Sequence, residues 1–189
     1  MRVLIAVEGT RGDVYPMLSL ARTLLAAGHA VRLCAPPDFA HEVRATGASF
    51  RSLGTPVRAF LEETAAAVHG GAVPMLREIA RFGDLSAASQ FRVLPEAAAG
   101  CDAVIGAGTI LAGASAAELH GVPYTAVIYT PAVVPSAEHT PCILPVQIRT
   151  RWINRGLWRA AAMALHATLR RALDRERRAL GLAPVRDAV

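Results

Sequence analysis

The sequence predicts an α/β protein with a doubly wound, Rossmann-like and mostly parallel sheet that has helices on both faces. Two observations support this fold class. Short runs rich in β-branched residues alternate with longer helical stretches, as in parallel strands joined by right-handed crossovers. Several of the short runs are apolar throughout, which is typical of strands covered on both faces. The length of 189 residues, with 53% hydrophobic and 19% charged residues, suits one domain over residues 1–189.

The elements follow one another in a regular order. Apolar Val3–Val7 is the first strand, and Val14–Ala27 is an amphipathic helix because Leu18 and Ala21 begin a 3–4 spacing of apolar residues. Glycines, Gly83 among them, separate three helices in the middle of the chain. Further strands are expected at Ala30–Ala35, Ser49–Leu53, Ala103–Gly106 and Tyr124–Ile128. Further helices are expected at Phe39–Ala45, Val57–Val68, Pro74–Arg81, Ala87–Ala99, Gly113–Leu119 and Arg151–Leu180.

One edge of the predicted sheet is expected to carry the chemistry. In a doubly wound sheet, ligands bind outside the carboxyl ends of the strands. The segments expected there are Gly9–Asp13, Pro36–Asp38, Leu53–Pro56, Gly106–Thr109 and Tyr129–His139. The last of these opens a proline-rich loop over residues 129–145, whose length is typical of a binding loop.

The residue content excludes several kinds of site. All 20 basic residues are arginine, so a Walker P-loop, a Schiff base and a pyridoxal enzyme, which all need lysine, are excluded. Cys34, Cys101 and Cys142 form no CxxC pair, and the histidines show no metal-ligand spacing. Gly106 and Gly108 lack the third glycine of a dinucleotide fingerprint. We therefore expect buried free thiols, no metal ion and no cofactor.

No segment predicts export or membrane insertion. The apolar start Val3–Val7 is too short for a signal peptide and is ended by Glu8. The longest uncharged run, Ala103–Ala117, falls short of the ~18 residues that a membrane span needs. We therefore expect a cytoplasmic protein.

Positive charge gathers at the C-terminal end. Residues 149–189 hold ten arginines and three acidic residues. Such a face suits nucleic acid or an anionic membrane surface. Aromatic residues are few there, however, and Arg175, Arg177 and Arg178 alternate with acidic residues. We expect a solvated or domain-covering helix and no nucleic-acid partner, and keep a membrane surface as an alternative.

A glycine turn joins the first strand to the first helix. Gly9 and Gly12 let backbone amides approach an anion at a helix N-terminus, or they simply make a tight turn, and their spacing leaves both interpretations open. Asp13 is either the N-cap of a helix that starts at Val14 or a general base that takes a proton from an attacking hydroxyl. The local pattern favours the cap.

The proline-rich loop carries Ser136, Glu138 and His139. A histidine at the mouth of a site can donate to a substrate oxygen or phosphate. A solvated loop histidine is the alternative that the sequence favours. No GxSxG elbow exists, so a Ser–His–Asp triad is not predicted.

The stretch GTRGDVYPMLSLARTLLAAGHAVRLCAPPDF, from Gly9 to Phe39, resembles the opening of bacterial GT-B glycosyltransferases that decorate antibiotic aglycones, and of sterol glucosyltransferases. The likeness continues in CDAVIGAG, ELHGVPYTAVIYTP and PSAEHTP. It closes with the Asn- and Trp-bearing stretch from Asn154 to Leu182 and so spans almost the whole chain. The opening GTRGDVxP is its most specific part.

The resemblance implies one half of a GT-B fold, an N-terminal domain that binds the acceptor. It implies an inverting, metal-independent transfer from a nucleoside-diphosphate sugar to a hydroxyl of a hydrophobic aglycone, sterol or lipid. Asp13 matches the proposed general base of this family, which changes the preference from cap to base. The residues expected to bind substrate are Gly9, Thr10, Arg11, Gly12, Gly108, Thr109, Ser136 and His139.

The sequence departs from this family's pattern in one respect. Nothing in it matches the glycine-rich donor motif of the second domain. We therefore expect the N-terminal portion of a longer enzyme, without the C-terminal donor-binding domain and unable to transfer sugar alone. The alternative is a non-catalytic acceptor-binding or auxiliary protein.

Overall fold

Five parallel strands form a single sheet in the computed structural model, which describes residues 1–54, 56–57, 72–142, 144 and 146–185. Their spatial order is β3-β2-β1-β4-β5, and each neighbouring pair runs parallel. This sheet confirms the predicted fold class. The strands are β1 (Arg2–Glu8), β2 (Ala30–Ala35), β3 (Ser49–Ser52), β4 (Ala103–Gly108) and β5 (Tyr124–Val127).

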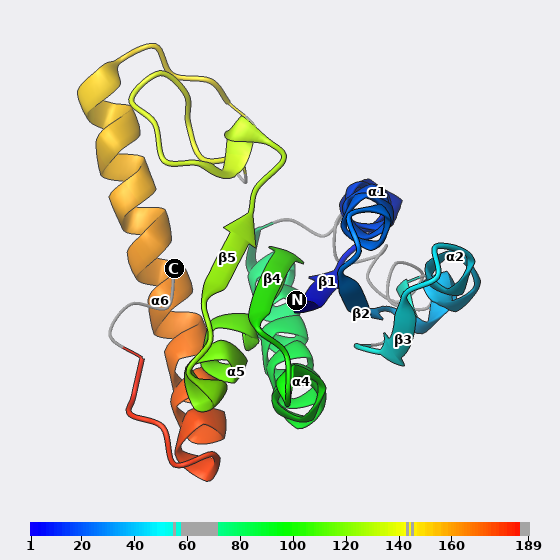
Figure 1. Cartoon of the computed structure of the whole chain (residues 1–189). Coiled ribbons are helices and arrows are strands. Elements are labelled where there is room, and N and C mark those ends of the chain that lie inside the picture. Colours follow the sequence, from blue (N-terminus) through cyan, green and yellow to red (C-terminus); the bar gives the residue numbers. More distant parts are fainter. Residues whose placement is uncertain (55, 58–71, 143, 145, 186–189) are drawn as a thin grey trace.

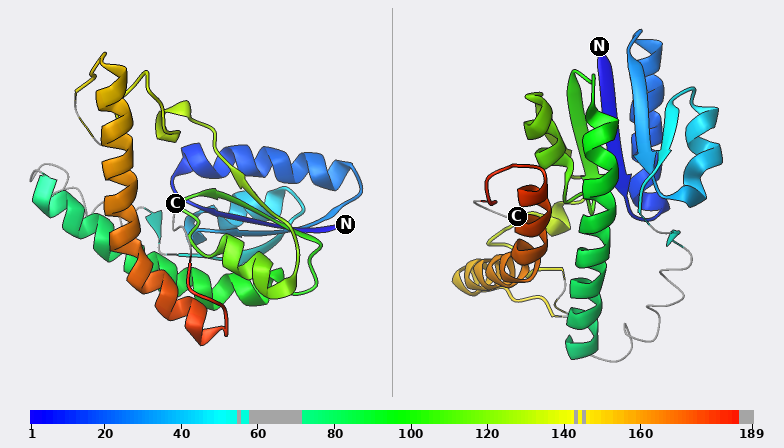
Figure 2. Two further views of the ribbon diagram at one scale, coloured as in Figure 1. Left: turned by 90° about the vertical axis from the view of Figure 1, so that its left-hand side faces the viewer. Right: turned by 90° about the horizontal axis from the view of Figure 1, so that it is seen from below.

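Helices cover both faces of the sheet (Figures 1 and 2). Because side chains alternate along a strand, β1 divides its residues between two halves of the core. Val3, Ile5 and Val7 pack with α1 and α2, whereas Leu4 and Ala6 pack with α4, α5 and α6. The helices are α1 (Arg11–Ala26), α2 (Ala40–Ala45), α4 (Ala72–Ala98), α5 (Gly113–His120) and α6 (Arg151–Ala179), with short 3-10 helices η1 (Pro37–Phe39) and η2 (Pro131–Val133).

The middle of the chain differs from the prediction. One helix, α4, replaces the two helices that were expected at Pro74–Arg81 and Ala87–Ala99. The helix continues through Gly83. The glycine lets α4 pack closely against α6, since a Cβ on Gly83 would lie 2.6 Å from a methyl carbon of Leu169. The glycine therefore marks a helix contact rather than a helix end.

Two further helix predictions differ in part from the structure. The segment predicted as one helix over Phe39–Ala45 is divided between the end of η1 and α2. The helix predicted at Val57–Val68 lies outside the described residues except for Val57.

The chain changes direction across the sheet between β1 and β4. From β1 it proceeds to β2 and β3 on one side, and from β4 to β5 on the other. The two strands pair in register, with Glu8 opposite Gly108 at their carboxyl ends. In open α/β sheets such a switch point leaves a crevice where ligands bind. The loops that follow β1 and β4 border this crevice.

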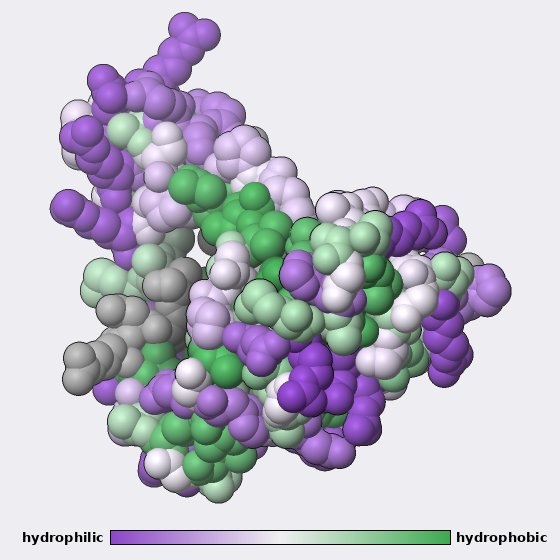
Figure 3. Space-filling view, in the orientation of Figure 1, coloured by the Kyte–Doolittle hydropathy of each residue, from purple (hydrophilic) through white to green (hydrophobic). Residues whose placement is uncertain are grey.

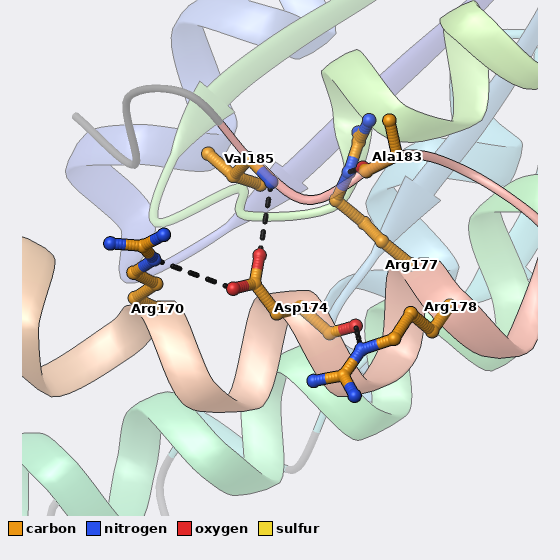
Figure 4. A network of polar contacts seen from close by, with 6 residues as sticks. All are labelled: Arg170, Asp174, Arg177, Arg178, Ala183 and Val185. Carbon is orange, nitrogen blue, oxygen red and sulfur yellow. Dashed lines mark hydrogen bonds and ion pairs between the residues drawn. The ribbon is translucent and has the colours of Figure 1, made fainter.

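The helix α6 is anchored at its C-terminal end by a polar network (Figure 4). Asp174 accepts from Arg170 and from the backbone N–H of Val185, and Arg177 donates to the carbonyl of Ala183 at 2.6 Å. Arg177 is buried, and it also reaches the Ser115 hydroxyl of α5. The expected solvated face is therefore wrong for Arg177, which joins α6 to α5.

The rest of α6 is more polar than a membrane span. Among the helices that the structure describes, none combines the length and the apolar character needed to cross a membrane.

The three thiols differ in exposure. Cys34 and Cys101 are buried, as predicted, but Cys142 is exposed on the proline-rich loop. Burial raises the pKa of Cys34 to about 12, so its thiol stays protonated and unreactive at neutral pH. In the described part of the chain, no three His, Cys, Asp or Glu side chains lie together as metal ligands.

Candidate active site

Asp13 lies in the first turn of α1, just past the carboxyl end of β1. The helix begins at Arg11 rather than Val14, so Thr10 is the N-cap and Asp13 is the third helical residue. Its Oδ2 accepts hydrogen bonds from the backbone N–H of Thr10 at 2.8 Å and from the Thr10 hydroxyl at 3.3 Å. Its Oδ1 receives no hydrogen bond from any residue that the structure describes. Capping therefore occupies one oxygen of a half-buried carboxylate and leaves the other available.

Two glycines pack directly against Asp13. Gly9 has a φ of 151°, and a Cβ there would lie 2.3 Å from Asp13 Oδ2. Gly108 has a φ of 66°, and a Cβ there would lie 2.2 Å from the carbonyl oxygen of Glu8. Any side chain at either position would displace the aspartate or the strand end. We call the site formed by Gly9, Asp13 and Gly108 the Asp13 notch.

The floor behind the notch is a buried polar network centred on Gln90 of α4. The Gln90 amide donates to the Glu8 carboxylate and to the carbonyl of Thr109 at 2.8 Å. Its carbonyl oxygen accepts from the backbone N–H groups of Leu111 at 2.6 Å and Ala112 at 3.0 Å. Gln90 is fully buried and so fixes the loop after β4 against the end of β1.

The sequence-based argument missed Glu8 and Gln90. Glu8 is a carboxylate at the end of an apolar strand, and it is buried beneath the Ser86 hydroxyl and the Gln90 amide. Ser86 and Gln90 stand one helical turn apart among the apolar residues on the buried face of α4. Polar residues at core positions of an amphipathic helix were the signal that would have found them.

Tyr129 borders the notch from the end of β5. Its hydroxyl donates to the backbone carbonyl of Asp13 at 2.8 Å. Burial, together with the negative charge of Asp13, raises the pKa of Tyr129 to about 12. The phenol therefore remains a neutral hydrogen-bond donor beside the aspartate at physiological pH.

The other residues predicted from the glycine turn and from β4 also lie at this edge. Thr10, Arg11 and Gly12 are exposed in and before the first turn of α1. Thr109 is exposed as well, but its N–H and its hydroxyl both donate to the carbonyl of Glu8, at 2.9 and 3.1 Å. The structure therefore brings these two predicted segments together around Asp13. Their role in substrate binding stays a prediction.

Ser136 and His139 lie in the loop that packs on α6, and no hydrogen bond among the described residues joins either to Asp13. The Ser136 hydroxyl accepts from the backbone N–H of Glu138 at 3.0 Å. The His139 ring packs edge-on against Trp158, with ring centres 5.6 Å apart. Ser136 lines a hollow between the loop and α6, whereas His139 lines a hollow formed by residues of the loop and of the segment that follows it.

Apolar side chains gather between the notch and this loop. Ile128 is 60% exposed, Val133 46% and Val134 43%. Figure 3 shows hydrophobic surface near the end of β5 in this orientation. Ile128 directly precedes Tyr129 in the sequence, and Val133 and Val134 follow it by four and five residues.

The described residues form a doubly wound domain with the Asp13 carboxylate at its switch point, and open α/β sheets as a class bind their ligands at this edge. Comparison with known families makes this specific. The glycosyltransferase family 28 N-terminal domain matches residues 3–135, and this chain belongs to that family.

Its curated relatives include glycosyltransferases from Amycolatopsis orientalis. Glycosyltransferase GtfE is 36% identical over 99% of this chain, and the match covers 46% of that protein. Vancomycin aglycone glucosyltransferase is 33% identical over 99% of this chain, covering 45% of that protein. The chain therefore spans about half the length of the curated relatives that it matches.

Solved structures share the fold at lower identity. The glycosyltransferase VinC, solved in complex with dTDP, has a TM-score of 0.62 at 23% identity, covering 100% of this chain and 47% of that chain. The glycosyltransferase of kitacinnamycin also gives 0.62, at 18% identity, covering 99% of this chain and 42% of that chain. Both are GT-B proteins, so the observed sheet is that of one GT-B half.

Proposed function

We propose that this chain is the acceptor-binding part of an inverting glycosyltransferase. The complete protein moves a sugar from a nucleoside-diphosphate sugar to a hydroxyl of a hydrophobic natural product or lipid. Asp13 is its general base. The observation that carries the proposal is the Asp13 carboxylate at the switch point, with Oδ2 held by Thr10 and Oδ1 open.

The chemistry assigned to Asp13 is one proton transfer. As the acceptor oxygen forms a bond to the anomeric carbon, its proton moves to Asp13. The bond from that carbon to the leaving diphosphate breaks, and the nucleoside diphosphate departs with the electron pair. The Thr10 N–H and hydroxyl hold the carboxylate in one orientation, and such positioning is part of what a general base requires.

The surroundings of the notch support a hydrophobic acceptor. Ile128, Val133 and Val134 are exposed within five residues of Tyr129 in the sequence, and Tyr129 contacts the first turn of α1. Exposed apolar side chains beside a few polar groups are typical of small-molecule sites. This domain supplies no metal ion or cofactor in the proposal, and the donor sugar is held by the half of the protein that lies outside this chain.

The test is the substitution Asp13→Asn in the full-length protein, assayed with nucleoside-diphosphate sugars and a panel of hydrophobic alcohols. Loss of a general base lowers turnover by about 10²–10⁴-fold. The amide oxygen of asparagine still accepts from Thr10 N–H, so the helix cap and the fold are retained.

Asp102→Asn is the matched control. Asp102 also accepts one backbone N–H through Oδ2, that of Arg2 at 2.6 Å, but it lies at the opposite end of β4. Its substitution is expected to leave turnover unchanged. Near-normal turnover of Asp13→Asn would reduce Asp13 to a cap. Acceptor binding without any transfer by the unaltered full-length protein would favour the auxiliary protein.

A further inference from the structure

An open hollow lies between the proline-rich loop and the N-terminal half of α6. Its volume is about 420 Å³. Ser136 lines it from the loop, and Arg155, Trp158 and Arg159 line it from the helix. We call these four residues and the space between them the basic hollow.

The walls of the basic hollow are held in place by side chains of α6. Asn154 is fully buried and donates to the carbonyls of Ala137 at 2.9 Å and Ile148 at 2.8 Å. The Trp158 indole N–H donates to the carbonyl of His139 at 3.0 Å. Loop and helix therefore form one unit, and the indole is fixed before any ligand arrives.

No acidic side chain among the described residues pairs with the two arginines of the hollow. Glu138 is the only acidic residue between residues 119 and 173, and it pairs with Arg151 at 2.8 Å. Arg155 and Arg159 stand one and two turns further along α6, and neither has an ion pair or hydrogen bond to any described residue.

Two guanidinium groups beside an aromatic ring suit one kind of ligand. Guanidinium binds carboxylate or phosphate through paired, charge-assisted hydrogen bonds. An indole face suits an aromatic or otherwise flat apolar body. Ser136 adds a hydroxyl on the loop side.

We propose that the basic hollow binds the carboxylate or phosphate group of a small aromatic or apolar molecule. The basic hollow is built by the proline-rich loop and α6 alone, so this inference does not depend on the role proposed for Asp13.

The experiment measures binding alone, on the 189-residue chain in the Trp152→Phe background. The chain has two tryptophans, so Trp158 is then the only one and reports on the hollow through its fluorescence. The probes are benzoate and phenyl phosphate, with benzyl alcohol as the neutral analogue. We expect both anions to change Trp158 emission saturably and to bind at least about 10-fold more tightly than benzyl alcohol.

The double substitution Arg155→Gln/Arg159→Gln is expected to remove this preference for anions. Arg171→Gln/Arg175→Gln lowers the net charge equally at exposed positions of the same helix, outside the network of Asp174, and it should leave binding within about twofold. Both arginines of the hollow are exposed, so the fold should tolerate their replacement.

Three outcomes would overturn the inference. They are equal affinity for benzoate and benzyl alcohol, anion binding that survives Arg155→Gln/Arg159→Gln, and binding only to phosphatidylglycerol vesicles, which would place a lipid headgroup in the hollow instead. No sugar donor is present, so failure here leaves the transfer test of Asp13 untouched. Conversely, an active Asp13→Asn enzyme would not affect the binding result.

Discussion

The Asp13 notch and the basic hollow are both polar sites, but the protein satisfies their polar groups to different degrees. Behind the notch, Gln90 uses both ends of its amide on Glu8 and the loop after β4. In the hollow, Arg155 and Arg159 have no partner within the described structure. Groups that are satisfied internally fix geometry, whereas unpaired groups at a surface remain available to a ligand. Substitutions in the two regions should therefore separate stability from binding.

The largest stability effect is expected for Gln90→Leu. Leucine fits the volume but removes the donor to the buried Glu8 carboxylate and the acceptor for Leu111 and Ala112. Leaving these groups unpaired should lower the free energy of unfolding by about 3–5 kcal/mol. Thermal and urea unfolding measure it, since each kcal/mol shifts the melting temperature by about 2–4 °C at this size.

Gln147→Leu is the matched control, because Gln147 is the other glutamine of the chain and is exposed just after the proline-rich loop. Its carbonyl oxygen accepts one long hydrogen bond from Thr140, at 3.4 Å. A change within about 0.5 kcal/mol is expected there. If both substitutions proved equally mild, the Gln90 network would not be what fixes the notch.

Features of the fold and of the site that depend on residues close together in the sequence could be predicted from it. Apolar runs predict the central strands β2, β1 and β4, because burial between two helix layers requires apolar residues at most positions. The edge strands β3 and β5 are largely exposed, and their prediction depended on the alternation of strands and helices. The glycine turn predicts close packing near Asp13, since only glycine allows the backbone to come so near. These features depend on neighbours in sequence.

Long-range contacts are what the sequence could not supply. Gln90 meets Glu8 and Thr109 only once α4 has packed under β1 and β4. Gly83 signals a helix end when read locally, but its contact with Leu169 of α6 decides its role. Likewise, the loop with Ser136 and His139 packs on α6 because Asn154 and Trp158 donate hydrogen bonds to its backbone carbonyls. The sequence of the loop alone does not predict these contacts.

An intermediate effect is expected for Asn154→Ala, which tests whether the frame of the basic hollow is as rigid as that of the notch. The substitution leaves the carbonyls of Ala137 and Ile148 without their donor. It also removes the buried Asn154 Oδ1, which has no partner among the described residues. Because this second change offsets part of the first, a loss of about 1–3 kcal/mol is expected.

The local readout for Asn154→Ala is acrylamide quenching of Trp158 in the Trp152→Phe background, which should increase as the loop loosens. Thr168→Ala serves as control, since this exposed hydroxyl bonds only the carbonyl of Ala164 one turn earlier on α6. Unchanged quenching in Asn154→Ala would show that Trp158 is held by other contacts, and the hollow would then be a preformed site without Asn154.

The smallest effect is expected for Tyr129→Phe, and it depends on pH. The substitution removes the hydrogen bond to the Asp13 carbonyl, which is expected to cost about 0.5–1.5 kcal/mol at neutral pH. The folded chain raises the pKa of Tyr129 from 10.0 to about 12, so folding favours the neutral phenol. This contribution is complete below pH 10 and is lost as the pH rises from 10 towards 12. The unaltered chain should therefore lose more stability than Tyr129→Phe across that range.

Tyr15→Phe is the control. Its exposed ring packs on Phe39, and its stability should change with pH as that of the unaltered chain does. Parallel curves for all three proteins would mean that the Tyr129 hydroxyl is not held beside Asp13.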